Sequence, residues 1–484
     1  MNTSLSDYRR LAAAYDVVPV VRELMADLET PVSMLRRFAD RANAFLLESI
    51  EGGETWGRYS FIGIDPVLLL DADHATTPGP QLLEGLRDIY RNIRAASIPG
   101  LPRFFGGAVG FIGYEAVGDM ERLPIPKTGA SRIRPISRFL KVDTLVVFDN
   151  LRHTIKIIAC SRPAEAASAE HAYEHALARI REIEATLRLP APPEEPAAYP
   201  PVEFQSNLTP DQYRQMVVRA KDYIVSGDVI QVVLSQRFSA RTAVPPLQMY
   251  RALRLLNPSP YMYFLKIGGQ TLVGSSPEIM VRLTGRRIEL RPIAGTRPRG
   301  ATEQEDRRLA DNLLSDEKEK AEHIMLVDLG RNDIGRVAEI GSVQVRDTMT
   351  IERYSHVMHI VSHVEGLLRG DQDAVDVIRA TFPAGTLTGA PKIRAMEIIH
   401  ELEPEPRGAY GGALGYISYD GSMDFAITIR TLDIADGTVA VQAGAGIVYN
   451  SDPQKEYEET CHKARGMQKA VMLAADGLRL QANG

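Results

Sequence analysis

Cysteine is almost absent from this sequence. The 484 residues include only two, Cys160 and Cys461. They lie far apart in the chain, and neither belongs to a Cys-x-x-Cys pair, the spacing that many metal and redox sites use. Proteins held together by disulfides carry many closely spaced cysteines. The sequence therefore excludes a disulfide framework and a cysteine-based metal site.

An excess of positive charge and long apolar runs are also missing. The formal net charge is -6, and Lys and Arg are interspersed with Asp and Glu, so nucleic acid is not an expected partner. No apolar run approaches the roughly 18 residues of a membrane-spanning helix. The polar N-terminus lacks the apolar core of a signal peptide. We expect a cytoplasmic protein that binds neither nucleic acid nor membranes.

The composition is that of a large globular protein, with 44% hydrophobic and 24% charged residues. Proline divides the chain, because residues 190–201 read PAPPEEPAAYPP, a composition that suits an extended spacer and cannot continue a helix. We predict an N-terminal region over residues 1–189, a proline-rich linker over 190–204 and a second domain over 205–484.

Helix and strand patterns come in groups along the chain instead of in strict alternation. Residues 163–189 and 209–225 have helical patterns, and Thr209 or Asp211 is available to cap the second. Short strand patterns follow in VIQVVLSQRF, YMYFLKI, TLVGSS and RRIELRPI. Such grouping favours an α+β fold with large antiparallel sheets over a doubly wound parallel sheet.

One metal-like pattern has a simpler interpretation. The segment HAYEH, from His171 to His175, matches the H-x-x-E-H pattern of one class of zinc hydrolases. It lies in an alanine-rich helical pattern beside the proline-rich linker. We therefore interpret these histidines as solvated surface residues.

Paired glutamates stand out in the last third of the chain. Glu319 and Glu322 are three residues apart in one helical pattern, and Glu456 and Glu459 are three apart in another. Residues at this spacing share a helix face. Carboxylate pairs of this kind are suited to magnesium.

Glycine-rich segments lie between and before these helices. RPIAGTRPRG (291–300) places glycines and a hydroxyl among arginines, QAGAGIV (442–448) is a strand pattern interrupted by glycines, and Arg430 ends the run FAITIRT. GTLTGAPK (385–392) lacks the ending of a P-loop, and Gly444-Ala445-Gly446 lacks the third glycine of a dinucleotide-binding pattern, so nucleotide binding is not supported. Together these segments favour a site for a small acidic molecule, although a tight turn without a ligand is an equally common use of such glycines.

Taken together, the motifs resemble those of the chorismate-utilising enzymes, most closely the anthranilate synthase component I group. The resemblance covers nearly the whole chain in one order, and implies the fold of that family. The matching segments are LLES (46–49), NPSPYMYF (257–264), GSSPE (274–278), RPIAGT (291–296), AEHIMLVDLGRND (321–333), YSHVMHIVSHVEG (354–366), TFPAGTLTGAPK (381–392), GAYGGALGY (408–416) and QAGAGIVYNSDPQKEYEET (442–460).

The resemblance implies a magnesium-dependent lyase that acts on chorismate in tryptophan biosynthesis. By their positions in the family motifs, Glu322 and Glu459 are the implied metal ligands, with Glu319 and Glu456 as supporting carboxylates. Magnesium would hold the ring carboxylate of chorismate and withdraw charge from the ring. On the residues alone, these glutamates could be exposed helix carboxylates paired with Lys318, Lys320 or Lys463, an interpretation that is weaker for Glu322 because it heads an apolar stretch.

The same resemblance assigns the remaining site residues. Glu278 is the implied proton donor to the departing C4 hydroxyl, a role that requires an enclosed site to raise its pKa. His359 corresponds to the histidine linked to catalysis, whereas a lone histidine in a strand is more often a core residue. The implied chorismate contacts are Gly295, Thr296, Tyr410, Arg430, Gly444, Ala445 and Gly446.

Two positions distinguish this chain from relatives with other products. Isochorismate and salicylate synthases carry a water-activating lysine where this chain has Gln231, and aminodeoxychorismate synthases often carry a nucleophilic lysine where it has Ala294. The expected nucleophile is therefore ammonia, giving aminodeoxyisochorismate and then anthranilate and pyruvate. The alternatives are those sister activities, or a non-catalytic regulator that binds chorismate or tryptophan.

The resemblance also implies partners and regulation. The chain has no glycine-flanked nucleophilic cysteine with a paired histidine, so a separate glutamine amidotransferase subunit, component II, would supply ammonia, in a heterotetramer. Tryptophan is the implied feedback inhibitor, and residues 1–189 are the implied regulatory region. The two halves of its pocket match Ser49 and the segment Pro260, Tyr261 and Met262.

Overall fold

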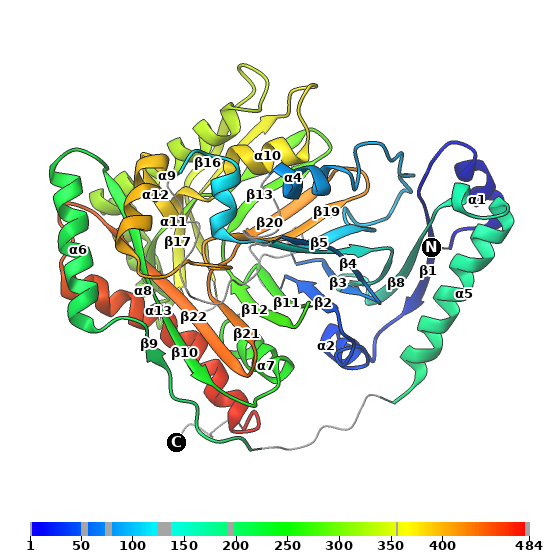
Figure 1. The fold of residues 1–484 in the computed structure, drawn as a ribbon, viewed down its shortest axis with the longest axis horizontal. Coiled ribbons are helices and arrows are strands. Elements are labelled where there is room, and N and C mark those ends of the chain that lie inside the picture. Colours follow the sequence, from blue (N-terminus) through cyan, green and yellow to red (C-terminus); the bar gives the residue numbers. More distant parts are fainter. Residues whose placement is uncertain are drawn as a thin grey trace.

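Two large antiparallel sheets form the centre of the molecule. The computed structural model describes residues 2–49, 57–72, 80–123, 137–190, 198–354 and 357–479. Within these residues the strands form one sheet of twelve strands and one of ten, with helices around them (Figure 1). The expected α+β fold with large antiparallel sheets is confirmed.

The larger sheet combines strands from both ends of the chain. Its neighbouring strands run antiparallel throughout the described residues. In spatial order it contains β1 (Val18–Met25), β8 (Thr154–Ser161), β7 (Thr144–Asp149), β3 (Tyr59–Gly63), β2 (Ala44–Glu48), β11 (Tyr261–Ile267), β12 (Gln270–Ser276), β21 (Thr431–Ala435), β22 (Thr438–Ile447), β10 (Gln231–Arg241) and β18 (Gly389–Ala390), and β9 (Gln205–Ser206) pairs with β10.

The smaller sheet also combines strands from the N-terminal region with strands from the rest of the chain. Its strands also pair antiparallel within the described residues. Its spatial order is β15 (Ile293–Pro298), β17 (Val357–Leu367), β14 (Arg287–Leu290), β13 (Ile279–Thr284), β20 (Met423–Ile427), β19 (Ala413–Ser418), β5 (Gly107–Ile112), β6 (Ser137–Val142) and β4 (Val67–Ala72), and β16 (Gln344–Arg353) pairs with β17.

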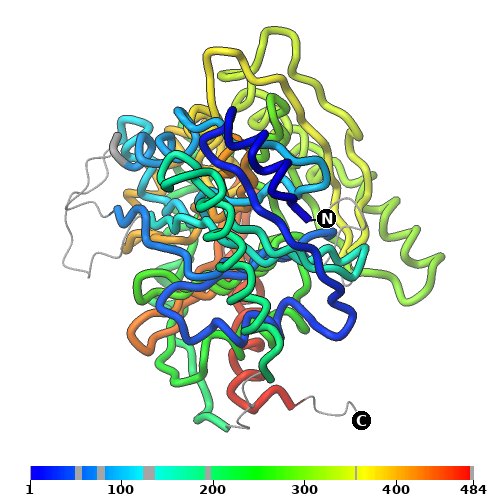
Figure 2. Tube along the Cα trace, turned by 90° about the vertical axis from the view of Figure 1, so that its right-hand side faces the viewer, coloured from blue at the N-terminus to red at the C-terminus, as the bar shows by residue number. Residues whose placement is uncertain are grey.

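The helices lie around the two sheets, and Figure 2 shows the N-terminal α1 beside α5. None of the described helices combines the length and apolar character needed to cross a membrane. Their bounds are α1 (Leu5–Ala12), α2 (Pro31–Arg36), α4 (Pro80–Arg87), α5 (Ala169–Arg188), α6 (Pro210–Val225), α7 (Pro246–Leu256), α8 (Glu303–Ser315), α9 (Glu317–Gly335), α10 (Ala374–Thr381), α11 (Gly385–Thr388), α12 (Lys392–Leu402) and α13 (Pro453–Ala475), with 3-10 turns η1 (Tyr114–Asp119) and η2 (Pro163–Glu165).

Alternating side chains of β2 belong to two separate cores. In β2, Phe45 is buried in the cluster that also contains Phe111 and Phe425 of the smaller sheet. Its neighbour Leu46 belongs to the cluster that contains Met467 of α13. Successive residues of a strand point to opposite faces. One core therefore lies between the sheets, and the other lies between the larger sheet and its covering helices.

Local capping explains where two predicted helices begin. Thr209 caps α6 through a reciprocal pair with Gln212, which confirms one of the two expected caps. The predicted start of the other helix at residue 163 is wrong. Residues 163–165 form only a 3-10 turn, and α5 begins at Ala169 because the Ser168 hydroxyl caps its first turn.

The predicted division at the linker remains a proposal. Residues 191–197 of that segment lie outside the described residues. Strands from before and after it share both sheets: β2 pairs with β11, and β5 pairs with β19. The N-terminal region is therefore joined to the rest of the chain by main-chain hydrogen bonds as well as by side-chain packing.

Candidate active site

A strand of glycines, a bulged strand and two glutamate-bearing helices meet at one place in the fold. Figure 1 shows α9, α11 and α12 gathered near the end of the β10–β22 pair, with α13 running along it. α13 packs on β22, and α9 packs on β15. These contacts bring the glycine-containing strands β15 and β22, which we expect to bind an acidic ligand, beside the helices that carry the paired glutamates.

The glycines of β22 lie where other groups approach the main chain closely. Gly444, Ala445 and Gly446 pair with Ser235, Leu234 and Val233 of β10, respectively. A Cβ atom on Gly444 would lie 2.7 Å from the Tyr410 hydroxyl oxygen, and one on Gly446 would lie 2.3 Å from Nε2 of Gln231. A larger residue at either position would displace the neighbouring side chain.

Gly295 brings the bulged strand β15 against α9. Its φ of +65° lies in the left-handed region, and the pairing with β17 shifts register between Ala294 and Thr296. A Cβ atom here would lie 3.1 Å from Oε2 of Glu319 and 2.9 Å from Leu313. Glycine is therefore suited to both the backbone conformation and the close approach.

The glutamates of α9 and α13 interact electrostatically. Burial raises the pKa of Glu322, and the charges of Glu319 and Glu459 raise it further. Burial also raises the pKa of Glu456, with a further contribution from the charge of Glu459. The four predicted glutamates, hereafter the glutamate cluster, therefore interact electrostatically, although they come from distant parts of the sequence.

Individual partners distinguish these glutamates. The side-chain amide of Gln231 donates to Glu322 at 3.5 Å. Glu459 is half-exposed and pairs with Lys463 at 2.7 Å, and Lys463 also donates to the Gly444 carbonyl oxygen at 2.9 Å. Among the residues that the structure describes, no three His, Cys, Asp or Glu side chains form a group that could hold a metal ion.

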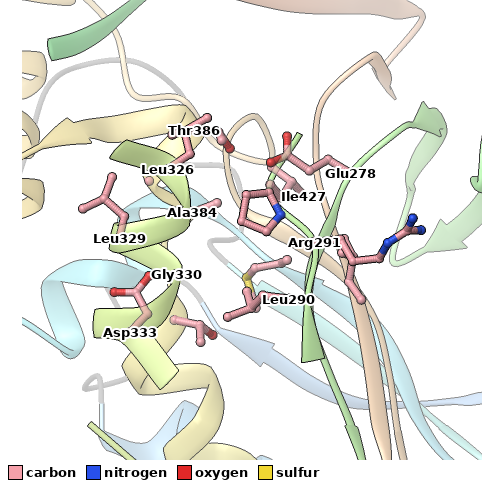
Figure 3. Close-up of a pocket in the computed structure, with 15 residues that line it drawn as sticks. Glu278, Leu290, Arg291, Leu326, Leu329, Gly330, Asp333, Ala384, Thr386 and Ile427 are labelled. Carbon is pink, nitrogen blue, oxygen red and sulfur yellow. The ribbon is translucent and has the colours of Figure 1, made fainter. Parts of the chain in front are cut away.

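Glu278 follows β12 and is buried at the end of the smaller sheet. Burial raises the pKa of its carboxyl group to about 8, against smaller lowering effects of the Thr386 hydroxyl and of Arg430 and Lys463. Figure 3 shows the carboxyl group turned toward Thr386 of α11. Both residues line a small cavity of about 40 Å³. At neutral pH the Glu278 carboxyl group is mostly protonated.

His359 lies near the start of β17, where it is buried and pairs with β15. Its Nδ1 atom is 2.9 Å from the Gly295 carbonyl oxygen and 3.1 Å from the Thr296 hydroxyl oxygen. A carbonyl oxygen only accepts, so Nδ1 carries the proton and donates it to Gly295. Burial lowers the pKa of the ring. A neutral ring of this tautomer leaves Nε2 free to accept a proton.

Arg430 connects these two groups electrostatically. It lies between β20 and β21 with a φ of +48°. Its positive charge lowers the pKa values of both Glu278 and His359, so all three side chains belong to one site. Sequence reasoning missed Thr386 as a residue of this site, although it lies within the quoted segment TFPAGTLTGAPK.

The predicted tryptophan-pocket residues lie around a separate cavity of about 350 Å³. Ser49 follows β2, and the segment 260–262 begins β11, which pairs with β2 so that Met262 lies opposite Glu48. All four predicted residues, Ser49, Pro260, Tyr261 and Met262, line the cavity. Its wall also contains the aromatic side chains of Tyr59, Phe61, Tyr263 and Tyr416.

The remaining metal-like pattern is a surface feature. His171 and His175 lie on α5 and are exposed to solvent. They belong to no group of potential metal ligands among the described residues. Their interpretation as solvated residues is confirmed.

Residues 42–469 match the family model described as chorismate binding enzyme. The match covers most of the chain, and the chain therefore belongs to the chorismate binding enzyme family. The expected resemblance to chorismate-utilising enzymes is confirmed.

Within that family, the chain groups with anthranilate synthase component 1 proteins. It is 48% identical to the protein of that name from Pseudomonas putida, over 97% of this chain and 98% of the relative. It is 45% identical to that of Acetivibrio thermocellus, over 98% and 99%. The crystal structure of anthranilate synthase component I from Streptococcus pneumoniae aligns with a TM-score of 0.75 at 39% identity, covering 87% of this chain and 93% of that one.

Proposed function

We propose that this protein converts chorismate and ammonia to anthranilate and pyruvate. The observation that carries the proposal is the convergence of Glu278, His359 and Arg430 on one site beside the glutamate cluster. The similarity to anthranilate synthase component 1 proteins supports the same reaction.

The residues at two positions favour ammonia over water or a lysine side chain as the nucleophile. Gln231 contacts Glu322 and lies beside Gly446, so an amide occupies the place of a water-activating base. Ala294 lies next to Gly295 in β15 and offers no nucleophile. Neither side chain can activate water or attack C2, so ammonia is the proposed nucleophile.

Chorismate would bind through its two carboxylates. Arg430 presents a planar guanidinium that suits a two-pronged bond to a carboxylate. The Tyr410 hydroxyl group approaches Gly444 closely. Tyr410 and the main chain of Gly444, Ala445 and Gly446 would therefore contact the same part of the substrate. Gly295 and Thr296, held by His359, complete the predicted contacts.

Glu278 acts as the general acid in this proposal. Ammonia adds at C2 while the C4 hydroxyl departs, and hydroxide is a poor leaving group. A carboxyl group with a pKa of about 8 still holds its proton at neutral pH and can deliver it to that oxygen, which leaves as water. The product of this step is aminodeoxyisochorismate.

His359 acts in the second half of the reaction. Loss of pyruvate from aminodeoxyisochorismate requires removal of the C2 proton, which makes the ring aromatic. The neutral ring, with its Nδ1 proton bonded to Gly295, offers Nε2 as the base. Its lowered pKa keeps it neutral near pH 7.

We propose that two carboxylates of the glutamate cluster hold a magnesium ion. Burial raises the pKa of Glu322 and of Glu456, and the charge of Glu459 adds to both, so a divalent cation would offset the repulsion at these two carboxylates. Magnesium typically takes one or two protein carboxylates and keeps waters or substrate oxygens as its other ligands. Glu322 and Glu459 would hold it, with Glu319 and Glu456 in support. When bound, it would fix the ring carboxylate of chorismate and withdraw charge.

We propose that residues 1–189 are regulatory and that residues 205–484 form the chorismate-binding catalytic domain. Tryptophan would bind the cavity lined by Ser49 and the segment 260–262, whose aromatic walls suit an indole ring. A glutaminase subunit, component II, would supply ammonia in a heterotetramer. Its interface is expected to bury at least about 1,000 Å².

The direct test is an assay of the purified chain with chorismate, magnesium and ammonium. Anthranilate fluorescence should rise with ammonium and stay at background with glutamine as the only nitrogen source. Anthranilate formation from glutamine by this chain alone would contradict the requirement for a glutaminase partner. Absence of anthranilate with ammonium would contradict the proposed reaction.

A further inference from the structure

A buried ion pair lies beneath the proposed chorismate site and has no role in the steps above. Glu403 is the C-cap residue of α12, and Arg407 follows it four residues later in a non-helical segment. Arg407 donates to the Glu403 carboxylate from Nε at 2.8 Å and from Nη2 at 2.7 Å. The two side chains are only 1% and 4% exposed. A buried ion pair is expensive to desolvate and gives little net stability, so its presence calls for another explanation.

The guanidinium also reaches two elements of the site. Nη2 donates to the Val233 carbonyl oxygen at 2.8 Å, and Nη1 donates to the Leu387 carbonyl oxygen at 2.7 Å. Val233 lies directly opposite Gly446. Leu387 follows Thr386, which faces Glu278. One planar side chain therefore joins the glycine strand pair to α11.

Glu403 secures the same strand at a second point. Its Oε1 atom accepts from both the main-chain nitrogen and the hydroxyl group of Ser235, each at 2.8 Å. Ser235 lies opposite Gly444 in the sheet. The ion pair thus holds β10 at Val233 and Ser235, which pair with the outer glycines of Gly444-Ala445-Gly446, hereafter the GAG segment.

Two tyrosine rings lie over the guanidinium. The Tyr114 ring centre is 4.5 Å from its central carbon and the Tyr410 ring centre is 5.6 Å away. Tyr410 is the residue whose hydroxyl group approaches Gly444. Stacking on a fixed cation restricts the plane of the Tyr410 ring and so the place of its hydroxyl group.

The N-terminal region fixes the main chain at the same point. The buried Glu115 carboxylate accepts from the main-chain nitrogens of Arg407 at 2.6 Å and Gly408 at 3.0 Å. The Tyr114 nitrogen donates to the Gly408 carbonyl oxygen at 2.8 Å. These bonds tie the N-terminal region to the main chain at Arg407 and Gly408.

We propose that Arg407, paired with Glu403, is a positioning residue for chorismate binding: it holds Tyr410 and the GAG segment in the arrangement that receives the substrate. Arg407 is buried beneath these groups and acts through them. The inference rests on the proposed function, because it concerns the placement of groups that would contact chorismate.

Arg407→Lys is the variant that tests this role. Lysine keeps the charge and most of the length, but its single ammonium cannot bond two carboxylate oxygens and two carbonyl oxygens in one plane or stack between two rings. We expect the KM for chorismate to rise at least about tenfold, with a smaller fall in kcat and an unchanged KM for ammonia.

The matched control is Arg87→Lys. Arg87 is also buried and bonds Asp373 and Asp376, each at 2.7 Å, between α4 and α10. Among the described contacts, it bonds none of the proposed chorismate contacts. Arg87→Lys should lower the thermal unfolding temperature of the protein and leave the KM for chorismate within about twofold of the value for the unmodified chain.

Ser235→Ala provides a second test if Arg407→Lys does not fold. It removes the hydroxyl's hydrogen bond to Glu403, together with the bond that the hydroxyl accepts from Gln442, and leaves the ion pair intact. The KM for chorismate should rise about threefold. An unchanged KM in whichever of these two variants folds, with only a lower unfolding temperature, would overturn the positioning role. Failure of the unmodified chain to make anthranilate would instead contradict the proposed function.

Discussion

Glu278 owes its proposed chemistry to its surroundings and not to its residue type. An exposed glutamate is ionised at neutral pH, but burial raises the pKa of this one to about 8. The neighbouring charges of Arg430 and Lys463 limit the rise without cancelling it. A proton donor at physiological pH follows from this balance.

The pH dependence of kcat tests that balance. The acid must be protonated, so kcat should fall about tenfold per unit as pH rises above about 8. The base must be neutral, and since burial lowers the pKa of His359, the acidic limb should lie below its usual 6.5. The measurement is made at saturating chorismate and a constant concentration of un-ionised ammonia. A basic limb that persists in Glu278→Gln would show that another group causes it.

Position 295 favours glycine for two reasons: the backbone has a positive φ, and neighbouring side chains leave little room for a Cβ atom. Gly295→Ala should lower the free energy of unfolding by at least about 1 kcal/mol, because φ is positive and the methyl group meets Leu313 and Glu319. It should also raise the KM for chorismate.

Gly285→Ala separates these two causes. Gly285 also has a positive φ, of +58°, but a methyl group there meets nothing within 4 Å. Its cost, by urea unfolding, should be the conformational one of about 1 kcal/mol, with activity unchanged. Equal stability losses and equal KM values in the two alanine variants would contradict the steric role of position 295.

At the scale of single elements, α9 and α13 carry the proposed metal ligands on helices that begin at firm caps. Asp316 accepts from the first-turn nitrogens of α9, and Asp452 does the same in α13. These caps fix where each helix begins. Both helices then pack on strands of the site, β15 and β22.

Replacing either of two adjacent glutamates of α13 by glutamine should show which of them binds magnesium. Glu459→Gln is expected to raise the magnesium concentration for half-maximal activity at least about tenfold, because it removes one of two proposed carboxylate ligands. Glu458→Gln changes the adjacent, exposed residue, which bonds Gln454 on its own helix, and should leave this concentration unchanged. The comparison is a magnesium titration of the initial rate. Equal magnesium dependence of the two variants would remove Glu459 from the metal site.

The sequence predicted element types well where the signal was local. Thr209 and Gln212 form the cap that their spacing indicates, and the grouping of strand patterns indicated antiparallel sheets. The early start assigned to α5 failed because an alanine- and glutamate-rich pattern does not reveal that Ser168 is the cap. A helix pattern alone locates a helix better than its first residue.

Long-range pairing could not be predicted in the same way. Nothing local in LLES indicates that β2 joins β11, more than two hundred residues later, in one register. The burial that sets the pKa of Glu278 and the network around Arg407 also depend on segments distant in sequence. The resemblance named most of the site residues, whereas their protonation states required the three-dimensional structure.

At the scale of the whole molecule, the N-terminal region and the remainder share both sheets. The cavity lined by Ser49 and the segment 260–262 lies at the β2–β11 contact between them. Its wall also includes Asp424 and Ala426 of β20, the strand that leads toward Arg430. A ligand in this cavity is therefore well placed to affect the active site.

Tryptophan should couple to chorismate through this arrangement. If it favours one conformation of the chain, it lowers chorismate affinity, and chorismate must lower tryptophan affinity by the same factor. We expect a change of at least about fivefold in each direction. Calorimetric titration of each ligand with and without the other measures both factors. Tryptophan binding that leaves chorismate affinity and turnover unchanged would contradict feedback inhibition.

The central claim is that this chain adds ammonia, and not water, to chorismate. Its most direct test is mass spectrometry of the products formed with nitrogen-15 ammonium and magnesium in oxygen-18 water. The account predicts anthranilate that carries one nitrogen-15 and no oxygen-18, together with pyruvate. Isochorismate or salicylate labelled with oxygen-18, or aminodeoxychorismate as the final product, would contradict it.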